Sequence, residues 1–264
     1  MDFPRAAAVA ARFAMLPETG STNTDLREHA EDPAGWPHLS VLTTRNQTAG
    51  RGRLDRVWTA PAGASLAVSV LLRRLPASID ARGWIPLAAG LAMAEAVAAQ
   101  LPDHEVGVKW PNDVLIGGGE AGGAGTFTHK ICGILAEATG ETIIVGAGVN
   151  TAMTAEELPV PTATSFAALG AEVDEDRLLA DYLQALDGHL TALVAADDAV
   201  RSGLHASVTG RCVTLGRDVR VSLPGGETVQ GRAMRLDADG RLVVLADEIE
   251  RAISAGDVVH AQAL

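Results

Sequence analysis

The chain has 264 residues, of which 47% are hydrophobic and 20% charged, so it can bury the core of one large or two ordinary domains and is not globally disordered. Its formal net charge of −12 disfavours nucleic acids and acidic membranes as general partners, so any basic site must be local. No run reaches about 18 uninterrupted apolar residues and no basic leader opens the chain, which predicts a cytoplasmic protein without a membrane span.

Composition and capping signals predict the first helices. The Ala-rich residues 5–16 predict a short leading helix. A second helix begins in GSTNTDLREHA, where Thr22 and Asp25 match a capping box, and DPAG at 32–35 ends it. Apolar residues at helical spacing predict a third helix over residues 84–101.

Strands account for most of the remaining residues up to 150. Runs rich in Val, Ile and Leu predict strands at 39–47, 64–72, 106–116, 129–138 and 142–150. Pro111 interrupts the strand VGVKWPNDVLI because it removes a donor from the ladder. Hairpin spacing between these strands predicts an α+β fold, in which helices flank a mixed or antiparallel sheet.

The last third of the chain divides into a helix and a set of short strands. A stripe of leucines predicts a long amphipathic helix, formed by Leu179, Leu183, Leu186, Leu190 and Leu193. From about residue 205 onward, short strands alternate with turns such as PGG and DADG, which predicts a small closed β-barrel. We therefore predict two domains, at residues 1–205 and 206–264.

The segment NQTAGRGRLDRVW is the first candidate for chemistry. Gly50 and Gly52 free the backbone to turn its amides toward an anion, and Arg51 and Arg53 offer planar guanidinium groups for phosphate or carboxylate. Trp58 offers a flat face on which a base can stack. The segment is thus either a lid that orders over an anionic ligand or an ordinary solvated turn.

The segment KWPND and two later strands supply further candidates. Asn112 and Asp113 follow Pro111, so they can present an amide and a carboxylate to a base, a magnesium ion or a lysine, or can simply form a turn. Lys130 opens an apolar strand and either reaches solvent or neutralises an anion over the sheet. Asn150 ends the strand TIIVGAGVN, whose glycines permit close approach of a ligand.

Other signals are weaker or absent. Ser21, Thr22 and Asn23 serve as a helix cap and can also present polar groups to a ligand. Cys132 and Cys212 lie in no metal or redox motif, which predicts buried free thiols. The glycine-rich residues 117–125 lack the Lys-Ser/Thr of a phosphate-binding loop and predict a hairpin linker.

The order and spacing of these motifs are more specific than any one of them. ETGSTNTD, TRNQTAGRGRLDRVW, KWPND, HKICGILAE and VGAGVN occur in that succession, which resembles the biotin protein ligases over residues 17–150. The resemblance implies a catalytic domain similar to class II synthetases, followed by an SH3-like barrel. It also implies ATP and biotin as substrates, with Mg²⁺. The reaction would form biotinyl-5′-AMP and then biotinylate a lysine of a carrier domain in an acyl-CoA or pyruvate carboxylase, releasing AMP.

The resemblance assigns roles residue by residue. The implied contacts to biotin are Ser21, Thr22, Asn23, Gln47, Gly50, Arg51, Arg53 and Lys130. The implied contacts to the nucleotide are Arg51, Gly52, Arg53, Trp58, Asn112 and Asn150. The implied catalytic groups are Lys130, Arg51 and Asp113, and Asp113 is also the candidate metal ligand.

Some relatives carry a DNA-binding domain ahead of the Ser-Thr-Asn cluster, which here begins at Ser21. We therefore expect no DNA-binding repressor role. We also expect the protein to be a monomer or weak homodimer. Three alternatives stay open: a non-catalytic biotin sensor, a lipoate ligase or octanoyltransferase of the same architecture, and a nucleic-acid binder.

Overall fold

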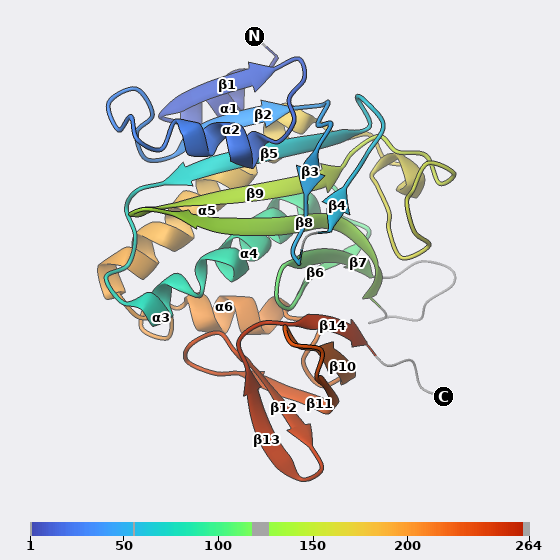
Figure 1. Ribbon diagram of the computed structural model, residues 1–264. Coiled ribbons are helices and arrows are strands. Elements are labelled where there is room, and N and C mark those ends of the chain that lie inside the picture. Colours follow the sequence, from blue (N-terminus) through green and yellow to red (C-terminus); the bar gives the residue numbers. More distant parts are fainter. Residues whose placement is uncertain (1, 55, 118–126, 261–264) are drawn as a thin grey trace.

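A seven-stranded mixed sheet forms the centre of the protein (Figure 1). The computed structural model describes residues 2–54, 56–117 and 127–260. In spatial order the strands are β1 (Arg12–Leu16), β2 (Ser40–Thr44), β5 (Ser65–Leu72), β9 (Thr142–Asn150), β8 (Phe127–Thr139), β7 (Asp113–Gly117) and β6 (Glu105–Lys109). Only the pair β1 and β2 is parallel among these described strands. The predicted α+β fold with a mixed sheet is confirmed.

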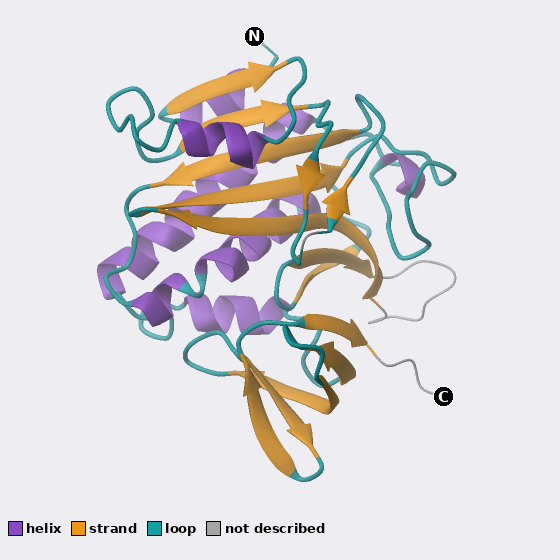
Figure 2. Cartoon of the chain, in the orientation of Figure 1, coloured by secondary structure: helices purple, strands orange, loops and turns teal. Residues whose placement is uncertain are grey.

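Helices cover both faces of this sheet (Figure 2). The helices are α1 (Pro4–Val9), α2 (Thr22–Glu28), α3 (Ile79–Arg82), α4 (Ile85–Ala98), α5 (Glu175–Ala196) and α6 (Leu204–Arg211), with a 3₁₀ turn at Ala167–Leu169. Helices α4 and α5 lie on one face, whereas α2 and the hairpin of β3 (Gly50–Arg51) and β4 (Val57–Trp58) lie on the other. No helix in the described ranges is both long and apolar enough to span a membrane.

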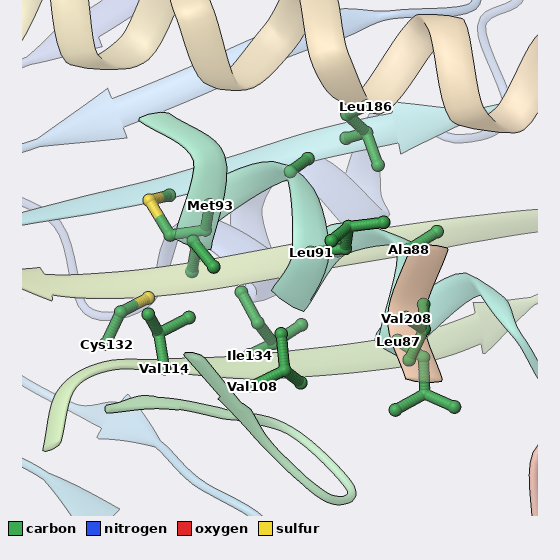
Figure 3. Packing of buried hydrophobic residues seen from close by; sticks show 14 of the residues in the cluster. Leu87, Ala88, Leu91, Met93, Val108, Val114, Cys132, Ile134, Leu186 and Val208 are labelled. Carbon is green, nitrogen blue, oxygen red and sulfur yellow. The ribbon is translucent and has the colours of Figure 1, made fainter. Parts of the chain in front are cut away.

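The core lies between α4 and the sheet (Figure 3). Leu91 and Met93 of α4 face Val114, Cys132 and other buried side chains of the central strands. Alanines and one glycine make up half of α4, so the helix backbone can approach the sheet closely. The predicted helix over 84–101 and the leucine stripe of α5 are both confirmed.

Two local predictions are wrong. The leading helix ends at Val9, and Arg12–Leu16 forms β1 because pairing with β2 outweighs the helix preference of nearby alanines. The capping box does not form, since the N-cap of α2 is Ser21 and its side chain makes no cap hydrogen bond. Asp25 instead accepts a hydrogen bond from the Thr19 hydroxyl.

A second sheet of five antiparallel strands follows α6. Its spatial order is β13 (Ile249–Ile253), β12 (Leu242–Ala246), β11 (Thr228–Leu236), β10 (Asp218–Ser222) and β14 (Asp257–His260). These strands confirm the predicted small C-terminal β domain, whereas its closure into an SH3-like barrel stays a prediction. The predicted boundary between residues 205 and 206 falls inside α6 and stays a prediction.

Two tryptophans attach the second sheet to the first. The indole of Trp84, at the start of α4, donates to Ala238 O (2.8 Å), and that of Trp110, after β6, donates to Gly240 O (3.0 Å). Both carbonyls belong to the turn between β11 and β12, and both indoles are at most 2% exposed. The turn is thus bonded to the start of α4 and to the segment that follows β6.

The junction also contains a histidine that should make stability depend on pH. Burial, and then the charges of Lys109 and Arg217, lower the pKa of His260 to about 4. The unfolded chain takes up a proton near pH 6.5, whereas the folded chain does so only near pH 4. The free energy of unfolding should therefore fall by about 2 kcal/mol between these limits, allowing for partial exposure.

Urea unfolding at pH 7.5 and pH 4.5 measures this loss. His260→Gln removes the titrating group, so its free energy of unfolding should change less between the two pH values than that of the wild type. Equal losses in both proteins would assign the pH dependence to other groups.

Candidate active site

A cavity of about 180 Å³ opens on the face of the sheet opposite α4. The hairpin of β3 and β4 and the start of α2 lie over it (Figure 1). The predicted site residues that line it are Ser21, Thr22, Asn23, Gln47, Arg51, Gly52, Arg53, Trp58, Asn112, Asp113 and Lys130. Segments more than 100 residues apart in the chain therefore meet where the sequence motifs predict a single site.

One end of the cavity is a fixed array of polar groups. Gln47 Oε1 accepts from the backbone N–H (2.9 Å) and the hydroxyl (3.2 Å) of Thr22. The buried Ser69 hydroxyl donates to Asn23 Oδ1 (2.6 Å) and lies 2.8 Å from the Thr22 hydroxyl. Asn23 Nδ2 donates to Glu137 (2.7 Å), so the orientation of its amide is determined from both sides. Such an array can read a neutral polar ligand by hydrogen bonds.

Glycines of β9 leave room for the side chains above the strand. A Cβ atom at Gly148 would lie 2.7–3.0 Å from ring atoms of Trp58, and one at Gly146 would lie 2.4 Å from Asn23 Oδ1. Both contacts are too short for any other residue. The sequence predicted that these glycines would admit a ligand, and in the structure they directly seat Trp58 and Asn23.

A β-bulge directs Lys130 into the cavity. Val114 pairs with Cys132 and Leu115 with Lys130, so Ile131 is an extra residue in β8. Lys130 therefore shares the cavity face with Gly133, and Ile131 enters the core. The backbone of Lys130 is also held by Thr162 O (2.7 Å) and by the N–H of Thr164 (2.8 Å).

The cavity has a local surplus of positive charge. Lys130 Nζ lies 2.6 Å from Asp113 Oδ1, and Arg56 pairs with Asp257. The described residues that line the cavity include four cations and two carboxylates, namely Arg51, Arg53, Arg56 and Lys130 with Asp113 and Asp257. Both Arg53 and the neighbouring Lys109 are partly buried, and this burial lowers the pKa of each cation. A net charge of this sign suits a ligand with two anionic groups.

The arginine loop is attached to its surroundings on several sides. Arg53 donates to Asn112 Oδ1 (3.1 Å) and Gly256 O (3.3 Å), and Arg51 contacts Glu137 at 2.9 Å. Arg56, Glu137, Asp257 and Ser69 were not predicted. Arg56 could have been predicted as a third arginine of the same loop. Glu137, Asp257 and Ser69 lie near the site only because of the tertiary fold, and no sequence motif marks them.

Two predicted residues do not line the cavity. Gly50 belongs to β3, where a Cβ atom would lie 2.5 Å from both Gln47 Nε2 and Trp58 O. Asn150 is 8% exposed, and its Nδ2 donates to Thr164 O (2.8 Å). The insert predicted over 117–125 lies outside the described residues apart from Gly117. Within the described part, no three His, Cys, Asp or Glu side chains are grouped so as to hold a metal ion.

Comparisons with known proteins agree with this geometry. Residues 16–150 match the biotin/lipoate A/B protein ligase family, and residues 214–261 match the biotin protein ligase C-terminal domain. The chain is 39% identical, over 93% of its length and 88% of the relative's, to a biotin–[acetyl-CoA-carboxylase] ligase of Mycobacterium tuberculosis. It is 36% identical to a bifunctional ligase/repressor of Salmonella typhimurium, over 53% of this chain and 41% of that protein.

The fold has the same relatives. A biotin protein ligase from Aquifex aeolicus, solved in complex with biotin and ATP, superposes with a TM-score of 0.76 at 23% identity and covers 96% of this chain and 100% of that one. A biotin protein ligase from Leishmania major in complex with biotin gives a TM-score of 0.62 at 24% identity, with 96% and 99% coverage. On these matches over both sheets, the chain belongs to the biotin/lipoate A/B protein ligase family, among its biotin protein ligases.

Proposed function

We propose that the chain is an ATP-dependent, AMP-forming biotin protein ligase. The observation that carries the proposal is the cavity that joins a neutral polar array to a group of cations around Lys130. Biotin has a polar ring system at one end and a carboxylate at the other, so its two ends match these two regions. The 39% identical relative is a biotin ligase, which favours biotin over lipoate as the substrate.

The first step brings two anions together. A carboxylate oxygen of biotin attacks the α-phosphorus of ATP, the bond from that phosphorus to the bridging oxygen breaks, and pyrophosphate leaves. Lys130 and the three cavity arginines lower the repulsion between carboxylate and phosphate, and the polar array fixes the approach of the biotin ring. Gly52 leaves the loop backbone free to follow the phosphate, and Trp58 offers its ring to the base.

The second step uses a lysine of a carrier protein. Its neutral amine attacks the carbonyl carbon of biotinyl-5′-AMP, an amide forms, and AMP leaves. Asp113 lines the cavity 2.6 Å from Lys130, so its carboxylate can accept the proton that the amine releases. If Mg²⁺ takes part in the first step, it would supply further positive charge to the phosphates, and the cavity carboxylates that could contact it, Asp113 and Asp257, are each paired with a cation.

A transfer assay tests the proposal. Purified protein is incubated with biotin, MgATP and a carrier domain, and the carrier's intact mass is measured. A mass gain of one biotinyl group is expected only when both biotin and ATP are present. Tight biotin binding without transfer would favour a sensor. If lipoate is adenylated in preference to biotin in direct competition, the protein would act as a lipoate ligase of the same family.

The loop arginine gives a more specific prediction. Arg51→Ala removes a contact with Glu137 and with Thr24 at the edge of the cavity. The adenylate should then escape before transfer and label bystander lysines at least about tenfold more than the wild type does. Mass spectrometry of albumin added to the reaction measures this labelling, and Arg177→Ala, at an exposed position of α5, is the matched control. Labelling confined to the carrier would exclude a lid role for Arg51.

The carrier protein, the oligomeric state and the cellular location of the enzyme are also proposals. Its carrier would be a domain of an acyl-CoA or pyruvate carboxylase, and the ligase would act as a monomer or weak homodimer in the cytoplasm. The free, buried Cys132 and Cys212 suit a reducing compartment. The net charge of −12 disfavours binding to DNA and hence a repressor role. Binding of duplex DNA at physiological salt would contradict this expectation.

A further inference from the structure

A second cavity, of about 380 Å³, adjoins the first. Arg53 and Asn112 line both, and the hydrogen bond between these side chains lies where the cavities meet. The space exists because β7 pairs with β8 only as far as Gly133, so β8 continues without that neighbour past Ile134. The start of α3 and the turn between β11 and β12 form the opposite wall.

The inner walls of this cavity are mainly apolar. They include Pro86, Leu87, Pro111, Leu135 and Ala136. Ile79 lies at the edge of the cavity and is 80% exposed, so its side chain is free to contact a partner. An extended hydrocarbon chain could thus lie against this apolar part of the wall.

The outer edge is acidic. Arg241 pairs with Asp237 (2.7 Å) and Asp239 (2.8 Å), and Asp80 lies close enough to act on its charge. Three carboxylates therefore surround one guanidinium, and Asp80, Asp239 and Arg241 line the cavity. The charged lining of the cavity as a whole is balanced, with Arg53 and Arg241 against Asp80 and Asp239, so the excess of negative charge is confined to this outer edge, where Asp237 adds a third carboxylate. A cationic group is therefore favoured at the edge of the second cavity, whereas the first cavity favours anionic groups.

We propose that the second cavity receives the acceptor lysine and docks the surface around it on the carrier domain. The acidic edge attracts the lysine's ammonium, Ile79 packs against an apolar side chain of the carrier, and the methylene chain follows the apolar wall toward Arg53 and Asn112. The inference rests on the proposed function, since it assigns a route for the amine of the second step. The triphosphate of ATP does not suit the second cavity, because the acidic outer edge would repel the phosphates.

Separate assays of the two half-reactions test this route. Asp80→Asn/Asp239→Asn removes two negative charges from the edge and should raise the KM for the carrier about tenfold at low salt, with the gap closing as salt is added. Biotin-dependent exchange of pyrophosphate into ATP should stay within about twofold of the wild type, as should transfer of biotin to hydroxylamine, a small amine that needs no docking. Ile79→Ser should raise the carrier KM without a salt dependence.

The matched control is Glu250→Gln, which removes an arginine-paired carboxylate from the same sheet outside the cavity. It should leave the carrier KM unchanged. An unchanged carrier KM in the double variant would overturn the inference while leaving the proposed function intact. A raised KM for ATP in the exchange assay would assign the cavity to the nucleotide and would also overturn it. Wild-type protein that fails at exchange itself would overturn the proposed function, and the inference with it.

Discussion

Lys130→Ala should slow formation of the adenylate by about 10²–10³-fold, comparable to removing one oxyanion-hole donor. The ammonium lies 2.6 Å from Asp113 within the cation group, where carboxylate and phosphate must meet. Its loss leaves the repulsion between the two anions less compensated, and it also leaves Asp113 unpaired. Biotin-dependent pyrophosphate exchange measures the effect directly.

The stability of the same variant distinguishes chemistry from folding. The Lys130 side chain is 41% exposed and its ion pair with Asp113 is partly solvated, so the free energy of unfolding should change by less than about 1 kcal/mol. Lys130→Arg keeps the charge and should recover part of the rate. Near-normal exchange by the alanine variant would remove Lys130 from the catalytic groups.

Trp110→Ala should lower the free energy of unfolding by about 3–5 kcal/mol, the usual cost of deleting a buried indole. The side chain is 2% exposed, its Nε1 donates to Gly240 O, and its backbone N–H donates to the Thr214 hydroxyl (3.0 Å). The deletion opens a cavity at the junction of the two sheets and leaves a buried carbonyl without its donor. Urea unfolding followed by far-ultraviolet circular dichroism measures the loss.

Trp110→Phe separates the packing from the hydrogen bond. It keeps most of the ring but not the donor, so about 1–2 kcal/mol should be lost. Trp84→Phe removes the equivalent donor to Ala238 O and should cost a similar amount. A loss of less than about 1 kcal/mol for Trp110→Ala would mean that the two sheets hold together without this contact.

The elements of the fold could be predicted where periodicity is strong. The leucine stripe of α5 predicts one buried helix face, and the apolar runs of β5 and β9 predict buried strands, so local pattern and final structure agree. Residues 12–16 were misassigned because β1 is short and gains its stability from a strand some 28 residues later. Such a non-local contact leaves no mark on local composition.

The site residues also depend on contacts that local sequence patterns do not reveal. Strand alternation would put Ile131, not Lys130, on the face of Gly133, and the bulge that reverses this has no residue signature in HKICG. Asp257 enters the cavity from β14, some 200 residues after the loop arginine with which it pairs. The motif order identified the family, whereas these contacts depend on how the two sheets meet.

The position of Trp58 has a practical consequence for spectroscopy. The chain has four tryptophans, of which Trp36, Trp84 and Trp110 are at most 5% exposed, whereas Trp58 lies half-buried in the wall of the first cavity. Intrinsic emission therefore contains one indole in the wall of the first cavity and three that do not line it. Ligand binding in the first cavity can therefore be titrated by the tryptophan fluorescence of the unlabelled wild-type protein, without a turnover assay.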